Sequence, residues 1–299
     1  MKKIPKIYVL VGYGDESETF IRSRKLWSDY IKNHDINFYF NVLTPSLASD
    51  LVLEVGDELR VGCGELHTDS IDKSSYSKNY TWNKSERFKF IHRRVMTFQY
   101  LLNKEPEPFW VLNTTVTSAI SIKRIKKIIE NYDCSNFFGG APIFKDIPFG
   151  NDFFVMLSGA GHLLSSDVLR LVVDRSQSMQ WDCLDDVWTS LILFDIPRVP
   201  LKRYDFTYEK SYSEIDVKNI SEKIDRAFQE GHYHFRVKSP LNNGIKREDL
   251  DPLILKQIFD AIKRSEENES FDMNKLLSFH SGLRSLNEEG KLLSIAREN

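Results

Sequence analysis

Short apolar runs alternate with segments of helical periodicity through the N-terminal part of the chain. The apolar runs are rich in β-branched and aromatic residues and predict strands over 7–12, 37–43, 109–112, 137–143 and 153–157. Apolar residues recur at helical spacing in the segments that predict helices, which are 18–33, 86–102, 118–131, 166–173 and 187–194. This alternation is typical of a mostly parallel central sheet flanked by helices, so we expect an α/β, Rossmann-like fold.

The character of the sequence changes after residue 208, where it becomes more charged and more helical. Within that part, 231–238 alternates in side-chain character and predicts an exposed strand. The C-terminal end predicts two amphipathic helices. We therefore expect a main domain over 1–208 and a mainly helical extension over 209–299 that packs on it. The polar segment 56–83 predicts a surface loop.

The bulk composition argues against several classes of protein. With 299 residues, 41% of them hydrophobic, the chain can bury a full core, and a net charge of -2 gives no reason to expect nucleic-acid binding. Cys63, Cys134 and Cys183 lie far apart without CxxC spacing, which argues against a disulfide framework and a zinc site. No run approaches the ~20 apolar residues of a membrane span, and no signal-peptide pattern follows Met1. We expect a cytoplasmic protein.

Three segments combine residues that can carry chemistry. An apolar strand runs into Asn113-Thr114-Thr115, a small-residue turn lies within 158–165, and the pair Asp185-Asp186 opens a helix. Each has a structural explanation on its own. Small residues permit close backbone approach, and acids at a helix start cap free N–H groups and complement the helix dipole. The order and spacing of the segments are more specific than any one of them.

Taken in order over residues 5–205, these segments resemble the β-1,3-glycosyltransferase and Fringe-like transferases, an inverting group with the GT-A fold. Arg22-Ser23-Arg24-Lys25-Leu26-Trp27 looks like the early Arg-x-x-x-x-Trp helix of that family. The basic helix around Arg93-Arg94 stands where the family has a lysine before its metal-binding strand. Ser158-Gly159-Ala160-Gly161-His162-Leu163-Leu164-Ser165 is similar to its Gly-Gly-Ala-Gly-aromatic-x-x-Ser turn, and Leu184-Asp185-Asp186-Val187 is similar to its Glu/Asp-Asp-Val motif.

The resemblance implies that a sugar is transferred from a nucleotide-sugar donor to a hydroxyl of a glycan or glycolipid acceptor. By family position, Asp186 would be the base that accepts the hydroxyl proton, and Asp185 would position it or contact sugar hydroxyls. Gly159, Ala160 and Gly161 would let the donor or the acceptor approach closely.

The chain departs from the family at the strand end, where Asn113-Thr114-Thr115 stands in place of an acidic metal-binding triplet. Asn and Thr offer neutral oxygens, whereas Mg²⁺ and Mn²⁺ favour charged ones. We therefore expect no metal cofactor, with Asn113 and Thr115 as donor contacts. Because a leaving diphosphate must still be neutralised, fixed positive charge is needed nearby.

The predicted strand over 231–238 is one source of that charge. Its period of two would place four side chains on one face, namely His232, His234, Arg236 and Lys238. Two imidazoles, a guanidinium and an ammonium suit a diphosphate. A solvated strand face explains the same pattern, and His232-x-His234 could be a metal pair that lacks a third ligand.

Helices supply the other candidate cations. Arg22 and one arginine of the Arg93-Arg94 pair are candidate donor contacts, although a solvated helix face also explains Arg22. Lys123-Arg124 and Lys126-Lys127 predict an exposed helix surface. The same residues would suit peripheral contact with an anionic membrane or an acidic glycan.

Two further interpretations stay open. A catalytically silent GT-A domain that binds glycan or a partner enzyme would explain the loss of the acidic triplet, whereas Asp185-Asp186 and the basic strand speak against it. An NAD-dependent α/β enzyme has little support, because Gly12-x-Gly14 is not followed by the rest of a dinucleotide-binding fingerprint.

Overall fold

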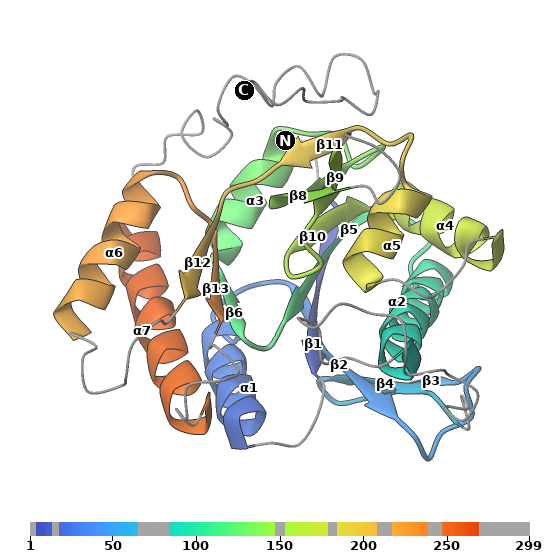
Figure 1. The fold of residues 1–299 in the computed structure, drawn as a ribbon, viewed down its shortest axis with the longest axis horizontal. Helices are drawn as coiled ribbons and strands as arrows, with labels where there is room; N and C mark the ends of the chain where they lie inside the picture. Colours follow the sequence, from blue (N-terminus) through green and yellow to red (C-terminus); the bar gives the residue numbers. More distant parts are fainter. Residues whose placement is uncertain are drawn as a thin grey trace.

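The computed structural model describes residues 4–13, 18–64, 84–146, 153–178, 184–207, 217–238 and 247–268. An eight-stranded sheet forms its centre, in the order β11-β7-β10-β5-β1-β2-β4-β3 (Figure 1). These strands are β1 (Lys6–Tyr13), β2 (Asn37–Thr44), β3 (Val52–Val55), β4 (Glu58–Gly62), β5 (Phe109–Thr115), β7 (Phe138–Gly140), β10 (His162–Ser165) and β11 (Arg198–Pro200).

Parallel pairing dominates this sheet. β1 pairs in parallel with β2 and β5, β2 with β4, and β7 with β11. β10 runs antiparallel to both of its neighbours, β5 and β7, and β3 runs antiparallel to β4. The prediction of an α/β fold with a mostly parallel central sheet is therefore confirmed.

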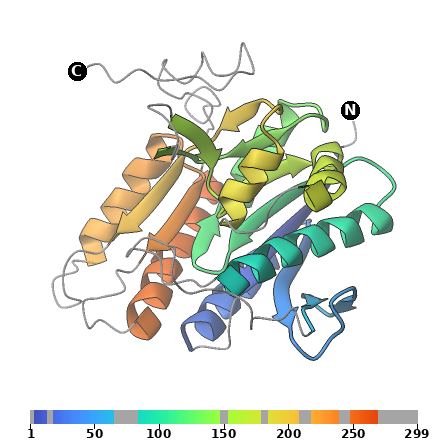
Figure 2. The ribbon, with the colours of Figure 1, turned by 45° about the vertical axis from the view of Figure 1, so that its right-hand side comes forward.

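Apolar residues on both faces of β1 explain why helices cover both sides of the sheet. Ile7, Val9 and Val11 enter one core, and Tyr8 and Leu10 enter the other. The first core is covered by α1 (Glu18–Ile31), α3 (Ile122–Glu130), α6 (Val217–Gln229) and α7 (Arg247–Asn268). The second is covered by α2 (Lys84–Lys104), α4 (Ser166–Arg175) and α5 (Asp185–Ile192) (Figures 1 and 2). A short 3₁₀ helix, η1 (Ser176–Ser178), follows α4.

Two smaller sheets complete the described strands. β8 (Pro142–Asp146) pairs with β9 (Phe153–Leu157), and a three-stranded sheet has the order β12-β13-β6. Its strands are β12 (Arg203–Thr207), β13 (His234–Lys238) and β6 (Ser118–Ile120). β13 is central in this sheet, parallel to β12 and antiparallel to β6. The predicted strand is therefore present over His234–Lys238, but the prediction that it is exposed was wrong, because β13 is paired on both edges and His234, Phe235 and Val237 are buried.

Several other predictions needed correction. The predicted helix 118–131 begins only at Ile122, because the residues before it form β6, and Ser121 caps the helix by accepting a hydrogen bond from the Arg124 backbone N–H at 3.2 Å. Arg124 does not belong to an exposed surface, since its guanidinium is buried and donates to the Phe228 and His232 carbonyl oxygens at 3.0 and 2.6 Å. Part of the predicted loop 56–83 is strand β4.

The segments after residue 208 pack closely on the earlier ones. β13 pairs with β12 and β6, and the Phe259 ring of α7 lies 5.2 Å from the Trp27 ring of α1. Glu266 of α7 accepts hydrogen bonds from Tyr30 Oη at 2.9 Å and Ser121 Oγ at 2.6 Å. The division at residue 208 stays a prediction, and the second predicted C-terminal helix lies outside the described residues.

Candidate functional site

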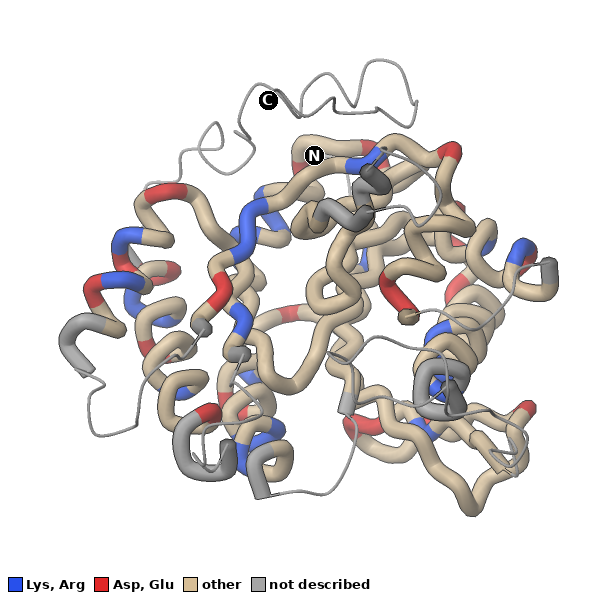
Figure 3. The backbone as a smooth tube through the Cα atoms, viewed as in Figure 1, with Lys and Arg blue, Asp and Glu red and all other residues tan. Residues whose placement is uncertain are grey.

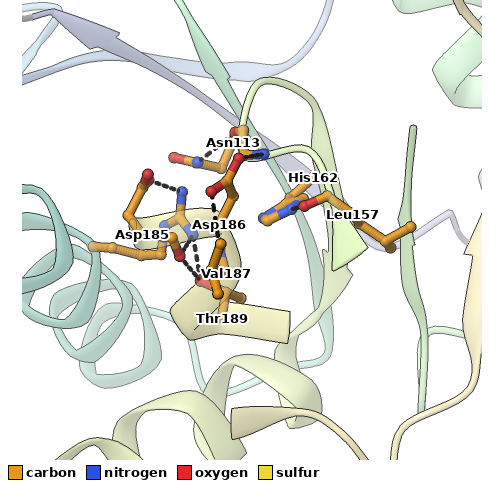
Figure 4. Close-up of polar contacts among 9 residues, drawn as sticks. Asn113, Leu157, His162, Asp185, Asp186, Val187 and Thr189 are labelled. Atoms are coloured by element: carbon orange, nitrogen blue, oxygen red, sulfur yellow. Dashed lines mark hydrogen bonds and ion pairs between the residues drawn. The ribbon is translucent and has the colours of Figure 1, made fainter. Parts of the chain in front are cut away.

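Three motifs that are far apart in the sequence meet at the turn between β9 and β10. Asn113 Nδ2, from the carboxyl half of β5, donates to the Gly159 carbonyl oxygen at 3.4 Å, and Gly161 N–H donates to the Asn113 carbonyl oxygen at 2.9 Å. The Gly159 N–H in turn donates to Asp186 Oδ2 at 3.4 Å. The strand end, the small-residue turn and the acidic pair therefore form one site (Figure 4).

The Asp186 carboxylate lies in the first turn of α5. Its Oδ1 accepts the backbone N–H of Val187 at 2.9 Å, and Leu184, the residue at the N-cap position, makes no side-chain cap hydrogen bond. Burial raises the pKa of Asp186, and the neighbouring Asp185 charge raises it further. The Gly159 and Val187 N–H groups and Arg94 act in the opposite direction. A partly buried carboxylate with a raised pKa suits proton transfer near neutral pH.

Asp185 is held by a buried arginine. Arg94 of α2 is 4% exposed, and its Nη2 lies 2.5 Å from Asp185 Oδ2. Its Nη1 donates to the Asp185 carbonyl oxygen at 2.9 Å and contacts Thr189 Oγ1, which donates to the same carbonyl at 2.6 Å. These contacts fix the first turn of α5 on α2, so Asp185 is placed to position Asp186.

Gly159 fits the closeness of these groups. A Cβ atom at this position would lie 3.0 Å from Asp186 Cβ and 3.3 Å from Arg94 Nη2. A larger residue would have to displace the carboxylate or the guanidinium. The small-residue turn thus allows the acidic pair to approach β5.

Arg93 and Arg94 point to different parts of the site. Arg93 Nη1 donates to the Asn41 carbonyl oxygen of β2 at 3.2 Å, and its Nη2 lies 2.9 Å from where a Cβ atom at Gly12 of β1 would stand. Arg93 therefore reaches the carboxyl ends of β1 and β2. Burial lowers its pKa to about 10, so the guanidinium stays charged at neutral pH. The carboxyl ends of parallel strands are where α/β sheets bind their ligands.

The three-stranded sheet contributes charged residues on its polar face, which we define as Ser118, Arg203, Asp205, His234 and Arg236. In the register of β12 and β13, Arg203 pairs with His234 and Asp205 with Arg236. Arg203 Nε lies 2.8 Å from Asp205 Oδ1, and its Nη2 donates to Oδ2 at 2.9 Å. Figure 3 shows basic and acidic positions close together on the backbone in the region of this sheet.

The polar face is turned toward the small-residue turn and the acidic pair. A Cβ atom at Gly161, whose φ is 108°, would lie 2.5 Å from His234 Nδ1. The pKa of Arg236 is lowered by burial and by Arg203, while Asp205, Asp186 and Asp185 oppose the shift through their charges. Burial and the two arginines hold the pKa of His234 well below its usual range, so its imidazole is neutral.

His162 lies beside Asn113, which is its partner in the pairing of β10 with β5. Its Nε2 lies 2.8 Å from the Leu157 carbonyl oxygen. Burial and the Arg94 charge lower its pKa to about 3. The imidazole is therefore neutral and available only for hydrogen bonding at ordinary pH.

Some candidate residues are not joined to this set. Arg22 is exposed on α1, which covers the opposite face of the sheet from α2 and α5. Thr115 Oγ1 contacts Thr117 and Ser118 hydroxyls at 3.4 and 3.1 Å, within its own turn. Lys238 ends β13, but its side chain lies outside the described residues.

His232 does not form a metal pair with His234. It precedes β13, and its Nδ1 lies 3.0 Å from the Ala227 carbonyl oxygen near the end of α6. Across the described ranges, no three His, Cys, Asp or Glu side chains are grouped to hold a metal ion. Within the same residues, no helix is long and apolar enough to cross a membrane.

Sequence reasoning missed Arg203, Asp205 and His162. The segment Arg203-Tyr204-Asp205-Phe206-Thr207 alternates charged and aromatic residues, and this alternation was the available signal for a strand with one polar face. His162 lies inside the recognised turn, but only the register with β5 shows its proximity to Asn113.

Comparison with known proteins finds similarity among solved structures. No family model and no curated protein matches the chain. Among solved structures, the chain is similar to the crystal structure of a glycosyltransferase involved in the glycosylation of the major capsid of PBCV-1. The match has 14% sequence identity and a TM-score of 0.41, and it covers 84% of this chain and 98% of that chain. Similarity at this level carries no argument about residue roles, so the roles proposed below rest on the contacts described above.

Proposed function

We propose that this protein is an inverting GT-A-type glycosyltransferase that works without a metal ion. The observation that supports this most is the meeting of Asn113, Gly159 and Asp186 through direct hydrogen bonds. The segments that carry the family resemblance are brought together around one carboxylate. That carboxylate has a raised pKa, as a general base requires.

Asp186 is the proposed base. In an inverting transfer, the acceptor hydroxyl oxygen attacks the anomeric carbon as the bond to the diphosphate breaks, and the hydroxyl proton passes to the Asp186 carboxylate. The backbone N–H groups of Gly159 and Val187 hold both carboxylate oxygens. Asp185, fixed by Arg94, keeps the first turn of α5 in place and raises the proton affinity of its neighbour.

Protein cations are proposed to take the place of the metal at the leaving group. Asn113, which replaces the first acidic residue of the triplet, uses its amide to hold the Gly159 carbonyl. Arg236 lies within electrostatic reach of Asp185 and Asp186, and Arg93 reaches the carboxyl ends of β1 and β2. Fixed guanidinium groups in a partly buried site stabilise a departing diphosphate strongly. Lys238 is a further proposed contact.

The proposed partners are a nucleotide-sugar donor and a glycan or glycolipid acceptor, with the reaction taking place in the cytoplasm or at the inner face of the membrane. The donor can be found by thermal-shift screening with UDP-, GDP-, CMP- and dTDP-sugars in EDTA. At least one of them should raise the Tm. If none does, the catalytically silent GT-A domain becomes the better account.

Transfer by the Asp186→Asn variant tests the base. Removing a general base should lower kcat by roughly 10²–10⁴-fold. Asp174→Asn, which changes an exposed aspartate at the end of α4, is the matched control and should keep full activity. Full turnover by Asp186→Asn would remove the proposed base.

A further inference from the structure

The polar face of the β12-β13-β6 sheet is buried although it is charged. Its strands alternate, so that Tyr204, Phe206, Phe235 and Val237 pack with the first core on one side. The residues between them point to the other side. The Arg203 side chain is 6% exposed there and His234 is fully buried. A sheet face of this kind must satisfy its polar atoms with protein, water or a ligand.

Three side chains on this face carry buried nitrogens without a hydrogen-bond partner in the described part of the chain. They are Nη1 of Arg203, Nε of Arg236 and both ring nitrogens of His234. Burying an unpaired donor costs about 1–3 kcal/mol, and more for a charged group. Neighbouring unpaired donors from three side chains are therefore the mark of a missing acceptor.

The geometry of the face favours an oxyanion as that acceptor. Asp205 holds Arg203 through two contacts, at 2.8 and 2.9 Å, which fixes the plane of the guanidinium. Arg236 adds a second positive charge beside it, and the neutral His234 imidazole adds one N–H donor. A tetrahedral phosphate can present a separate oxygen to each of the three side chains in a different direction, whereas the two oxygens of a carboxylate lie in one plane.

The position of the face connects it to the reaction. His234 lies against Gly161, in the same turn whose Gly159 N–H binds Asp186. A ligand on Arg203 and Arg236 would therefore lie close to this turn, and Arg236 is within electrostatic reach of Asp185 and Asp186 at the start of α5. On the proposed function, the donor diphosphate and a phosphate on the acceptor are the two sources of a phosphate at this position.

We propose that Arg203, His234 and Arg236 form a phosphate-binding site that needs no metal ion. The assignment of its ligand to the donor diphosphate or to an acceptor phosphate rests on the proposed function, but the site itself does not. Asp205 holds the Arg203 guanidinium in place. His234, which pairs with Arg203 in the strand register, supplies a neutral N–H donor.

Calorimetric titration with inorganic pyrophosphate, in phosphate-free buffer with EDTA, tests the site. The wild-type protein should bind, and Arg203→Gln and Arg236→Gln should each weaken binding by at least tenfold. Arg226→Gln, which changes an exposed arginine of α6, is the matched control and should bind like the wild type. Absence of binding by the wild type, or unchanged binding by both variants, would overturn the proposal.

Folding of the variants is checked by thermal melting. If Arg203→Gln does not fold, Arg236→Gln alone decides, because Arg236 is only partly buried. Tenfold weaker binding by that variant supports the site, and unchanged binding overturns it.

Competition identifies the source of the phosphate. Displacement of pyrophosphate by UDP, GDP, CDP or dTDP assigns the site to the donor, and displacement by farnesyl phosphate assigns it to a lipid-linked acceptor. If neither the nucleoside diphosphates nor farnesyl phosphate displaces pyrophosphate, the link between this site and sugar transfer is overturned.

The Asp186→Asn variant separates this site from the proposed function. It should bind pyrophosphate at least as tightly as the wild type, since it removes a negative charge nearby. If Asp186→Asn loses transfer while both arginine variants keep the affinity for pyrophosphate, the site is wrong and the function stands. If Asp186→Asn keeps transfer activity while the arginine variants lose affinity for pyrophosphate, the site stands and the proposed base is wrong.

Discussion

At the scale of single residues, the site contains a carboxylate whose ionised form is unfavourable in the folded protein. Asp186 lies beside Asp185 in a partly buried position, and both burial and the like charge oppose its ionisation. Arg94 and two backbone N–H groups offset part of this cost. Such a position is typical of a carboxylate kept for chemistry, because a neutral residue would fit it better.

Asp186→Asn should therefore stabilise the fold at pH 7 while it removes activity. The folded protein binds a proton at Asp186 more readily than the unfolded chain does, so ionisation of this group lowers stability as the pH rises through its raised pKa. The amide avoids that cost. The Tm should rise at pH 7, by roughly 2 °C for each kcal/mol in a chain of this size.

The exposed control Asp174→Asn should leave the Tm unchanged at pH 7. A Tm for Asp186→Asn below that of the wild type at pH 7 would contradict the electrostatic account of this carboxylate.

At the scale of elements, α7 is attached to the rest of the fold by a partly buried acceptor. Glu266 accepts from Tyr30 Oη, Ser121 Oγ and the Lys123 backbone N–H at 2.9, 2.6 and 3.2 Å. Ser121 is also the N-cap of α3, so one carboxylate links α1, α3 and α7. These helices support the three-stranded sheet from the side away from the polar face.

Glu266→Ala should destabilise the fold because it leaves these donors without their acceptor. The expected loss is about 1–3 kcal/mol in the free energy of unfolding, which urea denaturation would measure. Glu267→Ala, at an exposed neighbouring position, should cost almost nothing. Equal losses for the two variants would show that the Glu266 hydrogen bonds do not stabilise the attachment of α7.

The elements also show what could be predicted from the sequence. Strands β1, β2 and β5 and helices α1, α2 and α4 follow from local periodicity, whereas β6 and β12 were not predicted. The order of the motifs was enough to bring Gly159 and Asp186 into the same hypothesis. The burial of Arg124 was not predictable, because it depends on carbonyl groups more than a hundred residues away, at the end of α6. The pairing of Arg203 with His234 likewise depends on the register of two distant strands.

At the scale of the whole molecule, buried and partly buried histidines couple folding to pH. The pKa values of His34, His162, His232 and His234 are all lowered, in each case chiefly by burial. The unfolded chain binds protons at these residues near the ordinary histidine pKa of about 6.5, whereas the folded protein does so only at lower pH. Stability is therefore present above that pH and is lost as the pH falls below it.

The Tm should fall as the pH is lowered from 7 to 5. This window lies above the ordinary pKa values of Asp and Glu, so histidine protonation dominates it, and the opposite effect of Asp186 comes from a single group. Calorimetry in buffers of different ionisation enthalpy should detect proton uptake on unfolding at pH 5.5. A Tm that is constant or rises toward pH 5 would contradict the assignment of these histidines as neutral.

The central claim also concerns the whole molecule: protein cations replace a metal ion in sugar transfer. The most direct measurement is the acceptor-dependent release of nucleoside diphosphate, with the donor found by thermal shift, in EDTA and again with added Mn²⁺. The account predicts the same rate under both conditions for the wild type and a loss of roughly 10²–10⁴-fold for Asp186→Asn. Release that EDTA abolishes and Mn²⁺ restores would contradict it.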